Sequence, residues 1–102
     1  GEQAPAVARH RAILAGWMTA SGEAAEALPL LEGALEILAP ALNAADPRLA
    51  LARLELGRAL AVLGRHAEAE PLLLEGHERL AAIRPAGHRE LRTAARYLVE
   101  CY

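Results

Sequence analysis

The stretch that decides the fold runs from Asp46 to Leu74 and reads DPRLALARLELGRALAVLGRHAEAEPLLL. Asp46 is suited to cap a helix and Pro47 to occupy the first helical position, so this pair predicts a helix start. Gly64 interrupts the apolar run that ends at Leu63, and leucines resume beyond it. The stretch therefore predicts two helices joined by a tight turn.

The same pattern recurs 42 residues earlier. Gly22 matches Gly64, Pro29 matches Pro71, and the segment GEAAEALPLL aligns with GRHAEAEPLL. Glycine and proline that fall in register twice do not follow from an Ala- and Leu-rich composition, so we infer an internal repeat. A period of this length is typical of stacked pairs of antiparallel helices, in which each pair buries its apolar face on the next.

Composition and spacing together predict an all-α chain. Of the 102 residues, 54% are hydrophobic but only 3% aromatic, and strong helix formers dominate. Five helices are expected, over residues 5–20, 23–42, 47–63, 67–83 and 88–101. We expect one domain of about two and a half units, with units at 5–46 and 47–87 and a partial unit at 88–102, cut from a larger protein.

Apolar stripes predict which side of each helix faces the core. The first helix is expected to bury Ile13, Leu14, Trp17 and Met18. The last is expected to bury Leu91, Ala94, Ala95 and Leu98.

The local pattern resembles the tetratricopeptide repeat. Its alternation of small and large packing residues is carried by Leu56-Gly57, Leu60, Gly64, Ala69 and Leu73, with an earlier copy at Leu14-Ala15, Met18, Gly22, Ala27, Leu31 and Ala34. The phrase GRHAEAEPLL, after a helix that starts at Asp-Pro, resembles the longer 42-residue variant of kinesin light chains and of many bacterial multidomain proteins. This resemblance implies a right-handed α-solenoid that serves as a non-catalytic protein-interaction scaffold, here within a bacterial regulatory or signalling protein.

The resemblance also implies where a partner binds, because the first helix of each unit lines the concave face in such arrays. The residues implied are Arg9, Thr19, Leu51, Leu54, Arg58, Val62, Thr93 and Arg96. Guanidinium groups pair well with carboxylates, so an acidic protein or peptide partner is expected. The alternative for these arginines is a solvated row without a partner. The positions of the asparagine pair that holds a peptide backbone in kinesin light chains read Leu54-Glu55, Ala12-Ile13 and Arg96-Tyr97, a departure from the family.

Self-association is an alternative function. Residues 12–47 hold five acidic side chains and no arginine, whereas residues 79–102 hold five arginines and two glutamates. Opposite charges at the two ends favour contacts between copies. The last predicted helix lacks a second helix to pack on, so Tyr97, Leu98 and Tyr102 are expected to form an open seam that a partner or further chain covers. A second alternative, a small-molecule-sensing domain, would need an enclosed pocket.

No catalytic residue, metal or cofactor is predicted. The segment from His77 to Ala81 begins like the zinc motif HExxH but lacks the second histidine. Cys101 is the single cysteine and has no companion nearby in the sequence, so it is expected to be a packing residue. A net charge of −2 argues against a nucleic-acid partner. The absence of a long apolar run argues against a membrane span and leaves the cytoplasm as the expected compartment.

Overall fold

The computed structural model describes residues 4–43, 46–84 and 87–101. Its five helices are α1 (Ala4–Ala20), α2 (Ala24–Ala41), α3 (Pro47–Val62), α4 (His66–Ile83) and α5 (Arg89–Cys101), and no strand occurs in these ranges. The prediction of an all-α chain is confirmed. Every helix lies within a residue or two of its predicted bounds.

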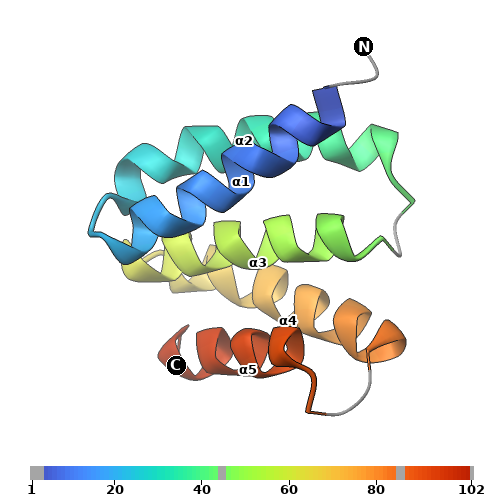
Figure 1. Cartoon of the computed structure of the whole chain (residues 1–102). Coiled ribbons are helices and arrows are strands. Elements are labelled where there is room, and N and C mark those ends of the chain that lie inside the picture. Colours follow the sequence, from blue (N-terminus) through green and yellow to red (C-terminus); the bar gives the residue numbers. More distant parts are fainter. Residues whose placement is uncertain (1–3, 44–45, 85–86, 102) are drawn as a thin grey trace.

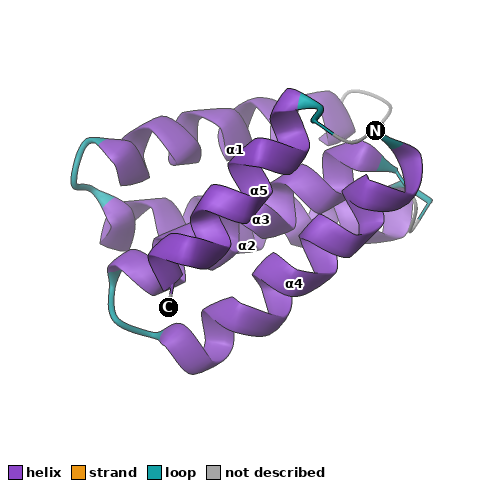
Figure 2. Cartoon of the chain, turned by 90° about the horizontal axis from the view of Figure 1, so that it is seen from below, coloured by secondary structure: helices purple, strands orange, loops and turns teal. Residues whose placement is uncertain are grey.

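The helices stack in layers (Figure 1). The α1–α2 pair lies at one end of the stack, α3–α4 in the middle and α5 at the other end. Within each pair the helices pack on each other, and α3 also contacts α1, α2 and α5. The view from below in Figure 2 shows α5 crossing in front of α3. This arrangement is the predicted α-solenoid.

Reciprocal packing of leucine on glycine holds α3 against α4. A Cβ atom added to Gly57 on α3 would lie 2.8 Å from Cγ and Cδ2 of Leu73 on α4. In the other direction, a Cβ atom added to Gly76 on α4 would lie 2.7 Å from Cγ of Leu54 on α3. Both leucines are fully buried. Each therefore fills the space that the missing side chain of a glycine leaves on the neighbouring helix.

The buried face of α1 differs from the prediction. Ile13, Leu14 and Trp17 are 46%, 49% and 70% exposed, and the helix instead buries a stripe of small residues. This stripe consists of Ala8, Ala12, Ala15 and Thr19. Met18, which is half-buried against the core, is the one predicted residue that does pack inward. Small side chains bring α1 close to α2, so the larger ones on the adjacent positions lie outside the core.

The inner face of α5 is also rotated from the predicted one. Ala94 is buried as expected, but Ala95 is exposed, and Leu91 and Leu98 are half-buried. The remaining core positions belong to Tyr97 and Cys101. An aromatic side chain beneath α3 therefore replaces the aliphatic stripe that the spacing predicts.

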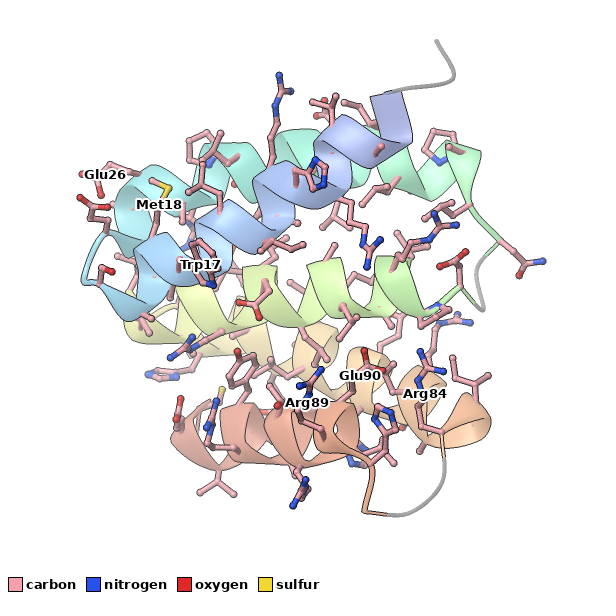
Figure 3. The ribbon with its side chains drawn as sticks, in the orientation of Figure 1. Trp17, Met18, Glu26, Arg84, Arg89 and Glu90 are labelled. Carbon is pink, nitrogen blue, oxygen red and sulfur yellow. The ribbon has the colours of Figure 1, made fainter. Side chains whose placement is uncertain are left out.

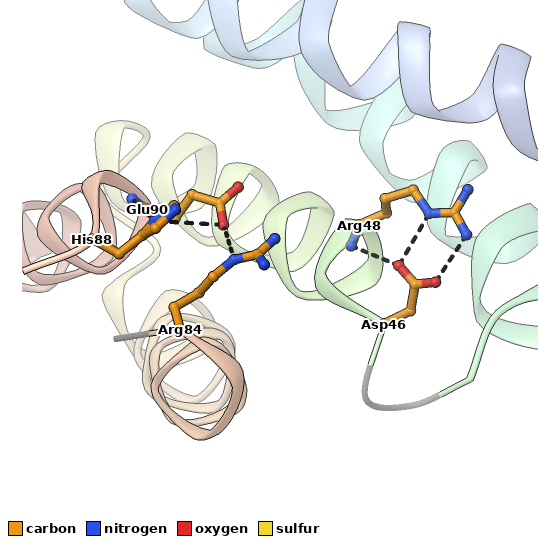
Figure 4. Close-up of polar contacts among 5 residues, drawn as sticks. All are labelled: Asp46, Arg48, Arg84, His88 and Glu90. Atoms are coloured by element: carbon orange, nitrogen blue, oxygen red, sulfur yellow. Dashed lines mark hydrogen bonds and ion pairs between the residues drawn. The ribbon is translucent and has the colours of Figure 1, made fainter. Parts of the chain in front are cut away.

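The turns and helix starts have local causes. Gly22, Gly64 and Gly87 all adopt a positive φ, of 91°, 84° and 87°, which glycine tolerates best. Asp46 caps α3, since its Oδ1 accepts a hydrogen bond of 2.9 Å from the backbone N–H of Arg48 (Figure 4). The side chain of Arg48 donates to both oxygens of the same carboxylate.

An ion pair joins the two helices on either side of the last turn. Arg84, which ends α4, donates from Nε to Oε1 of Glu90 on α5 at 2.7 Å (Figure 4). The backbone N–H of Glu90 donates to Nδ1 of His88, which precedes the helix. These contacts fix where α5 begins relative to α4.

We expect Gly57→Ala to lower the free energy of unfolding by about 1–2 kcal/mol, because the added methyl group meets Leu73 and this cost exceeds the gain in helix propensity. Gly33→Ala is the matched control: no atom lies within 4 Å of a Cβ at Gly33, so this variant should gain about 0.5–1 kcal/mol. Urea unfolding measures both. Equal effects of the two substitutions would contradict the reciprocal packing of leucine on glycine.

We expect Asp46→Ala to cost about 1 kcal/mol at neutral pH through loss of the cap. The hydrogen bond from the Arg48 side chain holds the pKa of Asp46 below its ordinary value of 3.8. A lowered pKa gives stability that is present above the unfolded value and lost as the pH falls through the folded one. The difference between wild type and variant should therefore shrink as the pH falls below about 4. Asp46→Asn, which keeps a capping oxygen, should cost less, and a difference independent of pH would refute this role.

Candidate functional site

A groove of about 350 Å³ lies between the first helices of the successive layers, α1, α3 and α5. It is open along one side. Its lining consists of Arg9, Ala12, Ile13, Gly16, Trp17 and Ala20 of α1, Leu38 of α2, Arg48, Leu51, Ala52, Glu55 and Arg58 of α3, and Tyr97 of α5. The surface is mostly apolar, with three arginines and one glutamate. We take this groove as the candidate site.

The groove contains three of the predicted partner-binding residues. Arg9, Leu51 and Arg58 line it. Arg96 lies beside it, with its guanidinium carbon 5.6 Å from the centre of the Tyr97 ring. Residues 51, 55 and 58 project from one side of α3 because their spacings of four and three residues match the helical turn.

Four other predicted residues lie elsewhere. Thr19 is 4% exposed, and its hydroxyl donates to the carbonyl of Ala15 at 3.0 Å, so it has no surface to offer. Leu54 packs on Gly76 of α4 and is 1% exposed. Val62 and Thr93 do not line the groove. The family positions carried over to residues 54 and 19 thus fall on the faces of α3 and α1 that pack inward.

Trp17 is the largest groove residue that the sequence reasoning missed. It extends from the C-terminal part of α1, on the side that faces α3 (Figure 3). The prediction assigned it to the core because it falls at helical spacing from Ile13 and Leu14. The alternative signal was the stripe Ala8, Ala12 and Ala15, which marks the buried face.

Glu55 and Tyr97 form a polar floor that the sequence reasoning also missed. The hydroxyl of Tyr97 donates to Oε1 of Glu55 at 3.0 Å. The other oxygen, Oε2, is buried without a hydrogen-bond partner among the described residues. A Cβ atom at Gly16 would lie 2.8 Å from this oxygen, so the glycine makes room for the carboxylate. The two residues lie 42 positions apart, at the same point of successive repeats.

Burial dominates the electrostatics of this floor. It raises the pKa of Glu55 above the ordinary 4.5, against the lowering effects of the Tyr97 hydrogen bond and the charges of Arg58 and Arg96. Burial likewise raises the pKa of the Tyr97 phenol, and the nearby charge of Glu55 adds to this increase. The guanidinium carbon of Arg58 lies 4.9 Å from the centre of the Tyr97 ring, within cation–π range.

The three groove arginines differ in their pairing. Arg48 is bound to the carboxylate of Asp46, with Nη2 2.8 Å from Oδ2 (Figure 4). Among the residues that the structure describes, Arg9 and Arg58 have no ion-pair partner within 4.0 Å, and Nε of Arg58 is buried without a hydrogen bond. As far as the structure describes the chain, the groove therefore holds two guanidinium groups that are not engaged in an ion pair.

Of the predicted self-association seam, the structure describes Tyr97 and Leu98, and neither is exposed. Tyr97 is 5% exposed and belongs to the groove floor, because its hydroxyl bonds to Glu55. Leu98 is half-buried against the core. Tyr102 lies outside the described residues. A large apolar residue that is exposed on α5 is instead Val99, at 75%.

Metal-ligating side chains are not clustered in the described part of the chain. No group of three His, Cys, Asp or Glu residues in it could hold a metal ion. Cys101 does have a companion that the sequence did not reveal, since its Sγ lies 3.7 Å from Nδ1 of His66. None of the described helices is both long and apolar enough to cross a membrane.

No protein-family model matches the sequence, and no curated protein matches it either. Two solved structures match over 96% of this chain. One is a protein from Podosopora anserina assigned as a kinesin light chain with nearly identical TPR-like repeats, with a TM-score of 0.83 and 28% sequence identity. The other is a variant of it, with a TM-score of 0.81 and 28% identity. The chain spans 46% of the length of each.

These similarities confirm the resemblance that the sequence indicates. The chain has a tetratricopeptide-like repeat fold of the kinesin-light-chain kind, the architecture of a protein–protein interaction scaffold.

Proposed function

We propose that the groove between α1, α3 and α5 binds an extended segment of a protein partner that carries acidic and apolar side chains. The observation that carries this proposal is the presence of Arg9 and Arg58 on the wall of a mostly apolar groove, where neither forms an ion pair with a described residue. A carboxylate of the partner would form charge-assisted hydrogen bonds with these guanidinium groups.

The apolar part of the groove supplies the other half of the recognition. Trp17 and Ile13 are 70% and 46% exposed on its wall, and the half-buried Leu51 also lines the groove. Exposed aromatic side chains beside arginine are typical of the residues that dominate binding energy at interfaces. An apolar side chain of the partner would bury Trp17.

The setting of this activity remains a prediction from the sequence. It comprises a bacterial regulatory or signalling protein, a cytoplasmic location and the absence of a nucleic-acid partner. The small-molecule-sensing alternative would need an enclosed pocket, and the groove is only partly enclosed. If the arginines instead form only a solvated row without a partner, their removal should leave peptide affinity unchanged.

Trp17 is the single tryptophan of the chain, so its fluorescence reports occupancy of the groove directly. We expect it to change on titration with an extended peptide of alternating Leu and Glu, and not with its Leu and Lys counterpart. Arg58→Ala should weaken binding of the acidic peptide roughly tenfold, or about 1.4 kcal/mol. Arg11→Ala, which removes an exposed arginine of α1 outside the groove, is the control. Equal affinities of the two variants would rule out the role of Arg58.

The pH dependence of binding tests the groove floor. Glu55→Gln keeps an oxygen for the Tyr97 hydroxyl but removes the negative charge, so it should bind the acidic peptide a few-fold more tightly at neutral pH, by less than about 1 kcal/mol. Because burial raises the pKa of Glu55, wild-type Glu55 becomes neutral at a higher pH than an ordinary glutamate. The advantage of the variant should vanish as the pH falls through that raised pKa. The ratio of the two dissociation constants cancels the peptide's own titration, and a ratio constant with pH would contradict the prediction.

A further inference from the structure

The helix-pairing positions of the repeat are altered on α5. On α3 these positions are Ala50, Leu54 and Gly57, which are buried, and Leu73, Gly76 and other residues of α4 pack there. On α1 the equivalent residues, 42 positions earlier, are Ala8, Ala12 and Ala15, which are buried too. On α5 the equivalent residues are Arg92, Arg96 and Val99, which are all exposed.

A helix could not pack on α5 as α4 packs on α3. Val99 occupies the position of Gly57, where even one added carbon would meet the incoming leucine at 2.8 Å. Arg96 occupies the position of the fully buried Leu54, and burial of an unpaired guanidinium is costly. The outer face of α5 is therefore polar where the repeat requires small apolar residues, as in terminal helices of repeat arrays.

This outer face carries positive charge. Arg89 and Arg92 are exposed, and within the described ranges neither has an ion-pair partner. Arg96 is 3.9 Å from Glu100, the long limit of an ion pair. Val99, at 75% exposure, adds apolar area beside the arginines.

The opposite end of the stack carries the complementary charge. Helix α2 has no basic residue, and Glu26, Glu32 and Glu36 are exposed on it. None of the three forms an ion pair with another described residue. The charge of Glu32 does act on Arg65, which precedes α4, so Glu26 and Glu36 are the two carboxylates of α2 that matter here. Figure 3 shows Glu26 at the α1–α2 end of the molecule and Arg89 at the α5 end. Counting only described residues, the chain therefore presents carboxylates without ion pairs at one end, Glu26 and Glu36, and guanidinium groups without ion pairs at the other, Arg89 and Arg92.

We propose that the outer face of α5 docks on the acidic outer face of α2 in a second copy of the chain. The two surfaces differ, so the contact is heterologous and one copy can bind a neighbour at each end. The contact is mainly between exposed charges, which makes it weak and sensitive to salt. It leaves the groove free, because Arg89, Arg92 and the α2 glutamates do not line it.

Sedimentation velocity of the 102-residue chain over a concentration series tests this proposal. At about 0.01 M salt the average mass should rise with concentration, and at about 1 M salt the chain should be monomeric. Arg89→Glu with Arg92→Glu gives a chain with two acidic ends, and Glu26→Arg with Glu36→Arg gives one with two basic ends. Each double variant alone should associate at least tenfold more weakly than wild type.

An equimolar mixture of the two double variants should associate again, since the acidic α5 of one meets the basic α2 of the other. Arg11→Glu, an inversion on α1 outside both faces, should associate as wild type does. A wild type that stays monomeric at low salt, double variants that associate normally, or a mixture that stays monomeric would each overturn the proposal. The mixture guards against misfolding, because misfolded chains would not regain a salt-sensitive assembly.

Discussion

The rest of the structure depends on the reciprocal packing of Leu54 on Gly76 and of Leu73 on Gly57. It fixes how closely α3 and α4 approach and how α3 is rotated about its axis. Residues 51, 55 and 58 lie about a quarter turn around the helix from residues 54 and 57. With 54 and 57 held against α4, they line the groove shared with α1 and α5. The groove and its charges are therefore consequences of how the central pair packs.

Side-chain size then decides what the groove displays. Alanines on α1 allow a close approach to α2, which leaves Ile13 and Trp17 outside the core and on the groove wall. Gly16 leaves room for the carboxylate of Glu55, and Tyr97 anchors that carboxylate from α5. A mostly apolar groove thus gains one exposed indole and three arginines, of which Arg48 is paired with Asp46. This combination suits a partner that is both apolar and acidic.

The fold could be predicted because glycine and proline punctuate the chain in register, and Asp46-Pro47 marks a helix start that the structure confirms. The groove could be predicted only in part. The family positions correctly place Arg9, Leu51 and Arg58 on the groove. They also place Leu54 there, but Leu54 packs on Gly76 of α4, a contact that only the structure reveals. Glu55 and Tyr97 occupy equivalent positions in successive repeats. Nothing in the sequence, however, indicates that their side chains form a hydrogen bond.

The most direct test of the groove as the functional surface is a map of amide chemical-shift changes by NMR during titration with the peptide of alternating Leu and Glu. We expect the largest changes on α1, α3 and α5, around Trp17, Leu51 and Arg58. The outer faces of α2 and α4 should be little affected. Changes confined to those outer faces, with Trp17 unperturbed, would contradict this expectation.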